Sequence, residues 1–111
     1  MQRQIPRIVK DLYINGKFTK AVKGQTFDVI NPSDETTLAT IQRGTQEDID
    51  LAVKAAQSAF EDGPWKRMDP SDRTHLLIKL SNLIEKNADE LALLESINNG
   101  KPASIAKAVD V

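Results

Sequence analysis

Short apolar runs separated by turn residues occupy the first third of the chain and predict β-strands. Leu12–Ile14 leads directly into Asn15-Gly16, and apolar character resumes at Phe18. Asn-Gly between such runs is typical of a β-hairpin, because a two-residue type I′ turn needs positive φ at both central positions and these residues tolerate it. We therefore expect a hairpin with Asn15-Gly16 at its tip.

Two longer extended runs follow the hairpin. The run at 26–30 stops at Asn31-Pro32, because proline lacks a backbone donor and disfavours helix at the residue before it. The run at 36–41 alternates apolar and polar side chains, as a half-buried strand does. Residues 11–43 are therefore predicted to form a β-hairpin and small meander, which is the β part of an α+β segment.

The spacing of apolar positions changes to that of a helix at Thr45. Thr45 and Asp48 have the spacing of a capping box, and the apolar positions that follow lie on one helical face: Ile49, Ala52, Val53, Ala56, Ala59 and Phe60. Asp62-Gly63-Pro64 predicts the end of this helix. Phe60 and Trp65 flank that turn, and we expect both rings to plug the end of a core rather than form an exposed patch.

Three further amphipathic helices complete the predicted helical part, residues 45–111. The second helix starts at Asp69-Pro70, with Asp69 as its cap and an apolar face made of Leu76, Leu77, Leu80, Leu83 and Ile84. Asn87 is the predicted cap of the third, whose inward positions are Leu91, Leu94 and Ile97. Asn98-Asn99-Gly100 predicts its end.

The fourth helix follows Lys101-Pro102 and carries an apolar stripe of Ile105, Ala106 and Val109. No helix-ending residue precedes Val111, so we expect this helix to be unfinished there, as in a fragment.

Composition and charge exclude several classes of protein. With 111 residues, of which 40% are hydrophobic and 28% charged, the chain has the size and balance of one globular domain. A net charge of −1 gives no field that would attract nucleic acid or an anionic membrane. No apolar run approaches the roughly 20 residues of a membrane span, so we expect no transmembrane helix. No targeting signal is evident, and we therefore expect a cytoplasmic protein. Residues 1–10 are predicted to be a flexible N-terminus.

Residues that could carry chemistry are few. The chain has no cysteine, which excludes a thiolate nucleophile and a thiolate metal site. His75 is the one histidine, and it sits in a leucine-rich helix, where a surface or packing role is the expected one. The acidic pairs Asp69 with Asp72 and Asp89 with Glu90 each fall in a first helical turn, where capping and the helix dipole explain them.

Two Asn-Gly-Lys triplets, at 15–17 and 99–101, superficially resemble phosphate-binding loops. The position where a P-loop needs its first glycine holds Asp11 in one case and Glu95 in the other, and Lys101 precedes proline rather than serine or threonine. We interpret both triplets as turns.

Taken in order, several segments resemble the N-terminal segment of the NAD(P)-dependent aldehyde dehydrogenase superfamily, closest to its general and retinal-type class. The resemblance covers residues 11–111 and is carried by Leu12–Lys17, Val29–Pro32, Asp50–Phe60, Pro64-Trp65, Arg73, Leu76-Leu77, Leu83–Glu85, Glu90–Ala92 and Asn99–Pro102. It implies an α/β fold in which this piece is part of the dinucleotide-binding domain.

The resemblance also implies what this chain does not contain. The family's catalytic cysteine, glutamate base, oxyanion-hole asparagine and dinucleotide-binding turn all lie in regions beyond this segment. We therefore assign no catalytic and no cofactor-binding residue, and expect NAD or NADP to be used by the full-length family rather than bound by this chain alone. The expected partner is the remainder of the aldehyde dehydrogenase fold or a full-length subunit. The alternative is a truncated, non-catalytic relative that acts as an interaction module or has no function.

One family feature falls within the chain. Some relatives hold a monovalent cation with two backbone carbonyls before Asn-Pro, here those of Val29 and Ile30, and with an aspartate that is Asn98 here. An amide oxygen can coordinate a cation but brings no charge, so the resemblance implies a weakened site and we expect no bound metal.

Overall fold

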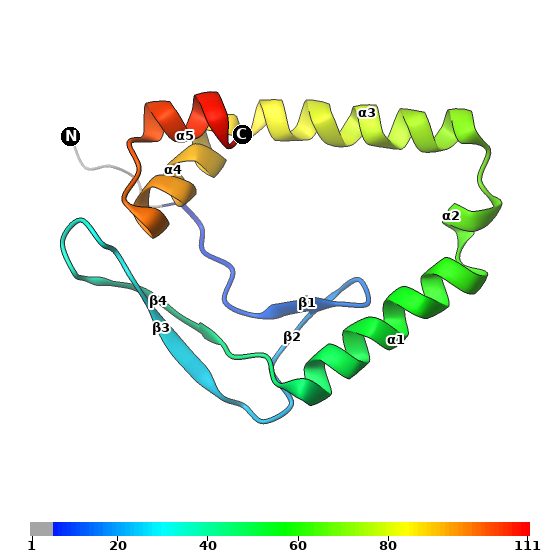
Figure 1. Cartoon of the computed structure of the whole chain (residues 1–111), viewed down its shortest axis with the longest axis horizontal. Coiled ribbons are helices and arrows are strands. Elements are labelled where there is room, and N and C mark those ends of the chain that lie inside the picture. Colours follow the sequence, from blue (N-terminus) through cyan, green and yellow to red (C-terminus); the bar gives the residue numbers. More distant parts are fainter. Residues whose placement is uncertain (1–5) are drawn as a thin grey trace. The chain divides into compact units, whose positions relative to one another are not determined.

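The computed structural model of the protein describes residues 6–111. Within them, four strands and five helices follow one another along the chain (Figure 1): β1 (Leu12–Ile14), β2 (Lys17–Thr19), β3 (Thr26–Ile30), β4 (Thr37–Gln42), α1 (Gln46–Asp62), α2 (Pro64–Arg67), α3 (Pro70–Lys86), α4 (Ala88–Asn99) and α5 (Ala103–Val109). They group into two compact units, whose boundary falls inside β3, β4 and α3. One unit holds residues 10–27 and 40–76, and the other holds residues 6–9, 28–39 and 77–111.

The β1–β2 hairpin has the predicted turn. Asn15 and Gly16 both have positive φ, of 52° and 74°, and the strands pair antiparallel with Ile14 opposite Lys17. Tyr13 lies opposite Phe18, and their ring centroids are 5.0 Å apart. Such tilted aromatic pairs across a hairpin add to the stability of a ladder this short.

β3 and β4 form a second hairpin, so the predicted meander is divided into two separate two-stranded sheets. Its loop is closed by hydrogen bonds in which Asn31 N donates to Thr36 O and Glu35 N to Asn31 O, both at 2.8 Å. The two sheets are separate because the chain after β2 turns back on itself. There Gly24 N donates to Ala21 O at 2.8 Å, and Ala21 N donates to the side chain of Gln42 at 2.9 Å.

α1 begins and ends where the sequence predicts, but a short helix follows it that was not expected. Thr45 and Asp48 form a capping box at its start, and Gly63 N donates to Ala59 O at 3.0 Å at its end. α2 then starts with Pro64 at its first position, where a missing backbone donor has no cost.

α3 and α4 meet at Asn87, whose role differs from the predicted one. Asn87 occupies the N-cap position of α4, but its side chain makes no capping bond to that helix. Its Nδ2 donates instead to Leu83 O at 2.6 Å, one turn back in α3. The backbone N–H of Asn87 also donates to Leu83 O, at 3.1 Å, so Asn87 closes the last turn of α3.

α4 ends at Gly100, as the sequence predicts, and Gly100 has a left-handed conformation with φ of 81°. α4 and α5 pack against each other (Figure 1), and each buries one alanine, Ala92 at 2% and Ala106 at 0% exposure. α5 runs from Ala103 to Val109, and the N–H groups of Asp110 and Val111 both donate to Ala106 O. The expectation that this helix is unfinished at Val111 stays a prediction.

Only small apolar side chains are buried among residues 6–111: Ala21, Ala39, Ala92 and Ala106. The apolar faces predicted on α1 and α3 form but remain exposed, as shown by Val53 at 59% and Leu77 at 59%. Phe60 and Trp65 do not plug a core, since they are 81% and 45% exposed. Periodicity defines an apolar face without defining what covers it, which is why this prediction fails.

The predicted flexible start, residues 1–10, falls partly on residues 1–5, which lie outside the described part. Residues 6–10 belong to no helix or strand, although Lys10 O accepts a hydrogen bond from Gln42 N at 3.0 Å. No helix among residues 6–111 has the length and apolar character needed to cross a membrane.

Candidate functional site

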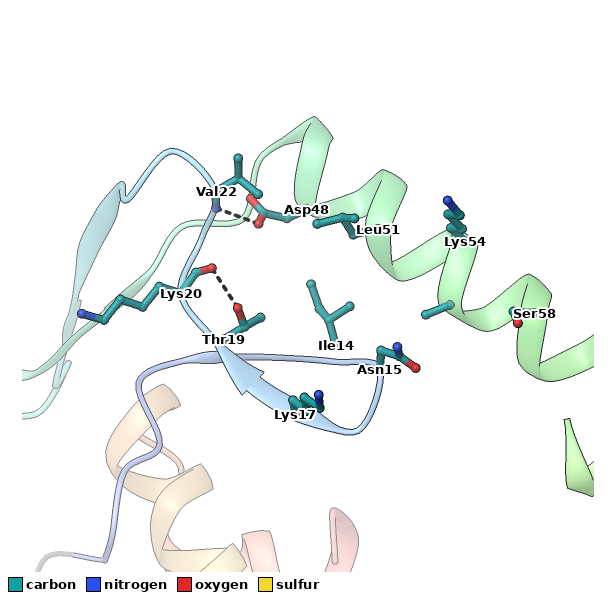
Figure 2. Close-up of a pocket in the computed structure, with 11 residues that line it drawn as sticks. Ile14, Asn15, Lys17, Thr19, Lys20, Val22, Asp48, Leu51, Lys54 and Ser58 are labelled. Carbon is teal, nitrogen blue, oxygen red and sulfur yellow. Dashed lines mark hydrogen bonds between the residues drawn. The ribbon is translucent and has the colours of Figure 1, made fainter.

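A groove between the β1–β2 hairpin and α1 combines charged and apolar side chains (Figure 2). It encloses about 460 Å³ and is lined by Ile14, Asn15, Lys17, Thr19, Lys20, Val22, Asp48, Leu51, Lys54, Ala55 and Ser58. The hairpin and the first turns of α1 position these side chains, because β1 packs on α1. Whether the groove can act chemically depends on its one buried charge, Asp48.

Asp48 is 3% exposed and its carboxylate accepts hydrogen bonds from three donors. Val22 N donates to Oδ1 at 2.9 Å, as Figure 2 shows, and Thr45 donates to Oδ2 from its N at 2.8 Å and its Oγ1 at 2.9 Å. The backbone donors of Thr45 and Val22, with the Thr45 hydroxyl, hold the pKa of Asp48 below its ordinary 3.8. Asp48 therefore joins the segment after β2 to the start of α1.

Glu47 adds a second, exposed charge beside this junction. Lys23 Nζ lies 2.8 Å from Glu47 Oε1, and Thr45 Oγ1 lies 2.8 Å from Oε2. These contacts, with Lys23 the larger cause, lower the pKa of Glu47 from 4.5 to about 2. Both carboxylates are thus ionised throughout the neutral range.

The groove has no group suited to acid–base or nucleophilic catalysis. A carboxylate whose pKa is lowered and whose oxygens already accept hydrogen bonds is a poor general base near pH 7. Ser58 would need a neighbouring base for activation, and no histidine lines the groove. Lys17, Lys20 and Lys54 are exposed. The arrangement stabilises backbone geometry rather than a reacting group.

The other side chains that could carry chemistry do not line the groove. His75 is exposed on α3, as the surface interpretation predicts. Asp72 falls in the first turn of α3, and Asp89 and Glu90 fall in the first turn of α4. Asp89 Oδ1 also accepts from Lys107 Nζ at 2.6 Å, which ties α5 to α4.

The candidate cation ligands occupy two segments that approach each other. Val29 and Ile30 end β3, and Asn98 is in the last turn of α4. Pro32 follows Ile30 by two residues, and Gly100 follows Asn98 by two. A Cβ placed on Gly100 would lie 3.1 Å from Pro32 Cγ, which shows that the two segments are close at this point. No cluster of three or more acidic, histidine or cysteine side chains able to hold a metal occurs in the described residues. The weakened cation site stays a prediction.

A second groove, largely apolar, lies along the end of α3 and reaches α5. Its walls are Leu77, Leu80, Ser81, Ile84, Glu85, Ala88, Lys107 and Val111. Leu77 and Leu80 are 59% and 54% exposed. Exposed apolar side chains that adjoin in this way mark a packing or association surface more often than a solvated one.

Comparison with known proteins identifies the family. The aldehyde dehydrogenase family profile matches residues 18–111. The chain belongs to this family. The mitochondrial aldehyde dehydrogenase of Rattus norvegicus is 46% identical over 101 residues, which are 90% of this chain and 20% of that protein. An aldehyde dehydrogenase of Alternaria alternata is 53% identical over 100 residues, again 90% of this chain and 20% of that protein.

Solved structures give the same result for the fold. The NAD+ complex of an aldehyde dehydrogenase from Bacillus cereus matches with a TM-score of 0.88 and 48% identity, covering 91% of this chain and 21% of that one. The resemblance and the α+β fold expected from the sequence are therefore confirmed. This aldehyde dehydrogenase chain spans about a fifth of the length of the relatives it matches, and corresponds to their N-terminal portion.

The sequence predicts only some of the hydrogen bonds of Asp48. The Thr45 and Asp48 spacing predicts the capping box, because both residues lie within one helical turn. The hydrogen bond from Val22 N to Asp48 spans 26 residues, and no local sequence pattern predicts it.

Proposed function

We propose that this chain supplies the N-terminal segment, within the dinucleotide-binding domain, of an NAD(P)-dependent aldehyde dehydrogenase, which oxidises aldehydes to carboxylic acids. The family match over residues 18–111 carries the proposal. The chain contains no cysteine, so the nucleophile of the family mechanism must come from outside these 111 residues. The segment acts as scaffold and does not itself bind NAD or NADP.

The partner that we propose is the remainder of the aldehyde dehydrogenase fold. Support comes from the apolar side chains that α3 leaves exposed, among them Leu77, Leu80 and Leu83 at 59%, 54% and 47%. Covering such side chains is favourable by about 25 cal/mol for each Å² of apolar surface removed from water. The near-neutral chain, with net charge −1, favours neither nucleic acid nor an anionic membrane as partner. A cytoplasmic location stays a prediction.

A chimera tests this proposal. The corresponding segment of the Bacillus cereus enzyme is replaced by residues 6–111, and NAD-linked oxidation of an aldehyde is measured. We expect the rate to stay within about tenfold of the parent enzyme, a change of about 1.4 kcal/mol in the barrier. The isolated chain should show no oxidation, and the parent enzyme without the segment should be insoluble or inactive. A soluble chimera of parental assembly that fails to oxidise aldehydes would contradict the proposal.

The exposed apolar faces also favour a second function, that of a non-catalytic interaction module. In that case the isolated chain, added to the intact Bacillus cereus enzyme, should co-elute with it on gel filtration. The double variant Leu77→Asp and Leu80→Asp should lose this association, whereas Lys79→Asp on the same helix should keep it. Activity of the chimera without any association of the isolated chain favours the scaffold role.

A further inference from the structure

The two Asn-Gly-Lys triplets have the same sequence but very different surroundings. Asn15-Gly16-Lys17 forms the tip of the β1–β2 hairpin, and Asn99-Gly100-Lys101 forms the end of α4. Asparagine side chains are chemically labile, and a following glycine offers least hindrance to attack by its backbone nitrogen because it has no Cβ. The pair therefore allows the effect of structure on one reaction to be separated from the effect of sequence.

At the hairpin tip, the Asn15 side chain and Gly16 N are not fixed by hydrogen bonds within the described residues. Within residues 6–111 the Asn15 side chain makes no hydrogen bond to another residue, and Figure 2 draws none to it. Asn15 is exposed, and no backbone hydrogen bond from Gly16 N is found in the described structure. Nothing lies within 4 Å of the position that a Cβ on Gly16 would occupy, so the turn has room to rearrange.

At the end of α4, each of the corresponding groups is engaged. Asn99 Nδ2 donates to Glu95 Oε1 at 2.6 Å, and Asn99 Oδ1 accepts from Lys101 N at 2.8 Å. Gly100 N, which would be the nucleophile, donates to Ser96 O at 2.9 Å. A Cβ on Gly100 would meet Pro32 Cγ at 3.1 Å, so this turn is also crowded.

We propose that Asn15 is a site of spontaneous deamidation and that the structure protects Asn99 from the same reaction. Gly16 N, losing its proton to solvent, forms a bond to Asn15 Cγ; the Cγ–Nδ2 bond breaks and ammonia leaves, which gives a succinimide ring. Water then adds to one of the two ring carbonyls. Opening at one gives aspartate and at the other isoaspartate, and the sum is amide plus water to carboxylic acid plus ammonia.

The two products differ in their effect on the hairpin. Asp-Gly suits a two-residue type I′ turn as Asn-Gly does, so aspartate preserves the pairing of Ile14 with Lys17. Isoaspartate adds a main-chain carbon to the turn, and a two-residue connection of that length does not close the same register. The modification therefore converts part of the molecules to a form with an open hairpin.

Peptide mapping after incubation of the purified chain at mildly alkaline pH tests the proposal. Trypsin separates the sites, since Asn15 lies in the peptide Asp11–Lys17 and Asn99 in the peptide Asn87–Lys107, in which Pro102 blocks cleavage after Lys101. Three hydrogen bonds must open at Asn99, so we expect Asn15 to react at least about tenfold faster in buffer. In concentrated urea the two rates should agree within about twofold, because the same residues follow each asparagine.

Two variants make the test specific. Asn15→Asp should remove the fast mass change while leaving the turn intact, and Glu95→Ala, which removes the acceptor of Asn99 Nδ2, should raise the Asn99 rate by about two- to fivefold. Equal rates at the two sites in buffer, or a faster reaction at Asn99, would overturn the proposal. A tenfold difference that persists in urea would also overturn it, since the protection would then come from sequence.

Discussion

Around Asp48 the chain is held by a buried carboxylate, whereas between α4 and α5 it is held by two buried alanines. Asp48 joins backbone donors from Thr45 and Val22, and its burial depends on all of them. Ala92 and Ala106 let two helices approach closely, and the ion pair of Lys107 with Asp89 adds little because both side chains are largely exposed. One region therefore depends on charge and hydrogen bonding, and the other on side-chain size.

The largest expected effect is from removing the charge at Asp48. Asp48→Asn keeps the shape of the side chain but turns one oxygen into a donor that faces other donors, so we expect the midpoint of thermal unfolding to fall by about 10 °C. Asp50→Asn is the matched control, since Asp50 is exposed on the same helix and accepts a single bond from Gln46. Equal shifts in the two variants would show that burial at Asp48 has no special role.

A smaller effect is expected from enlarging a buried alanine between α4 and α5. Ala106→Leu places extra side-chain volume where Ala106 has 0% exposure, which should lower the thermal midpoint by about 8 °C through overpacking. Ala108→Leu on the same helix lies at an exposed position and should change it by no more than about 2 °C. If Ala106→Leu is tolerated as well as Ala108→Leu, close packing does not hold this pair.

The smallest effect is the response to acid, which should appear around Asp48 and not between α4 and α5. The folded pKa values of Asp48 and Glu47 lie below their ordinary 3.8 and 4.5, so their contribution is complete above about pH 4.5 and is lost as pH falls toward about 2. Between pH 5 and pH 2.5 the thermal midpoint of the native chain should fall a few degrees more than that of a Glu47→Gln, Asp48→Asn variant. Parallel curves for the two proteins would refute this origin of acid sensitivity.

The parts of the fold that the sequence predicts are those set by neighbouring residues. Asn15-Gly16 specifies its own turn, Thr45 and Asp48 specify the start of α1, and Gly100 specifies the end of α4, because each depends on local backbone conformation. The turn after β2, by contrast, is held partly by the Gln42 side chain, which accepts a hydrogen bond from Ala21 N across 21 residues. Hydrogen bonds between residues so far apart in the sequence cannot be predicted from the periodicity of apolar and polar positions.

The candidate sites show the same limit. Sequence spacing predicts apolar faces on α1 and α3, yet Phe60 and Leu77 are 81% and 59% exposed. Asn87 illustrates a finer failure, since its position between two helices is predictable but its choice of Leu83 O is not. An amide can satisfy either the end of one helix or the start of the next, and the choice depends on side-chain rotamer and geometry.

The two sets of bonds to Asp48 also imply an order of events during folding. Its bonds to Thr45 close a loop of three residues, whereas its bond to Val22 closes one of 26. Because short loops lose less chain entropy on closure, the start of α1 can form before the segment after β2 arrives. We therefore expect the Asp48 carboxylate to be oriented by Thr45 before Val22 N reaches it, so that one side chain acts first at the start of a helix and then in a contact with a distant segment.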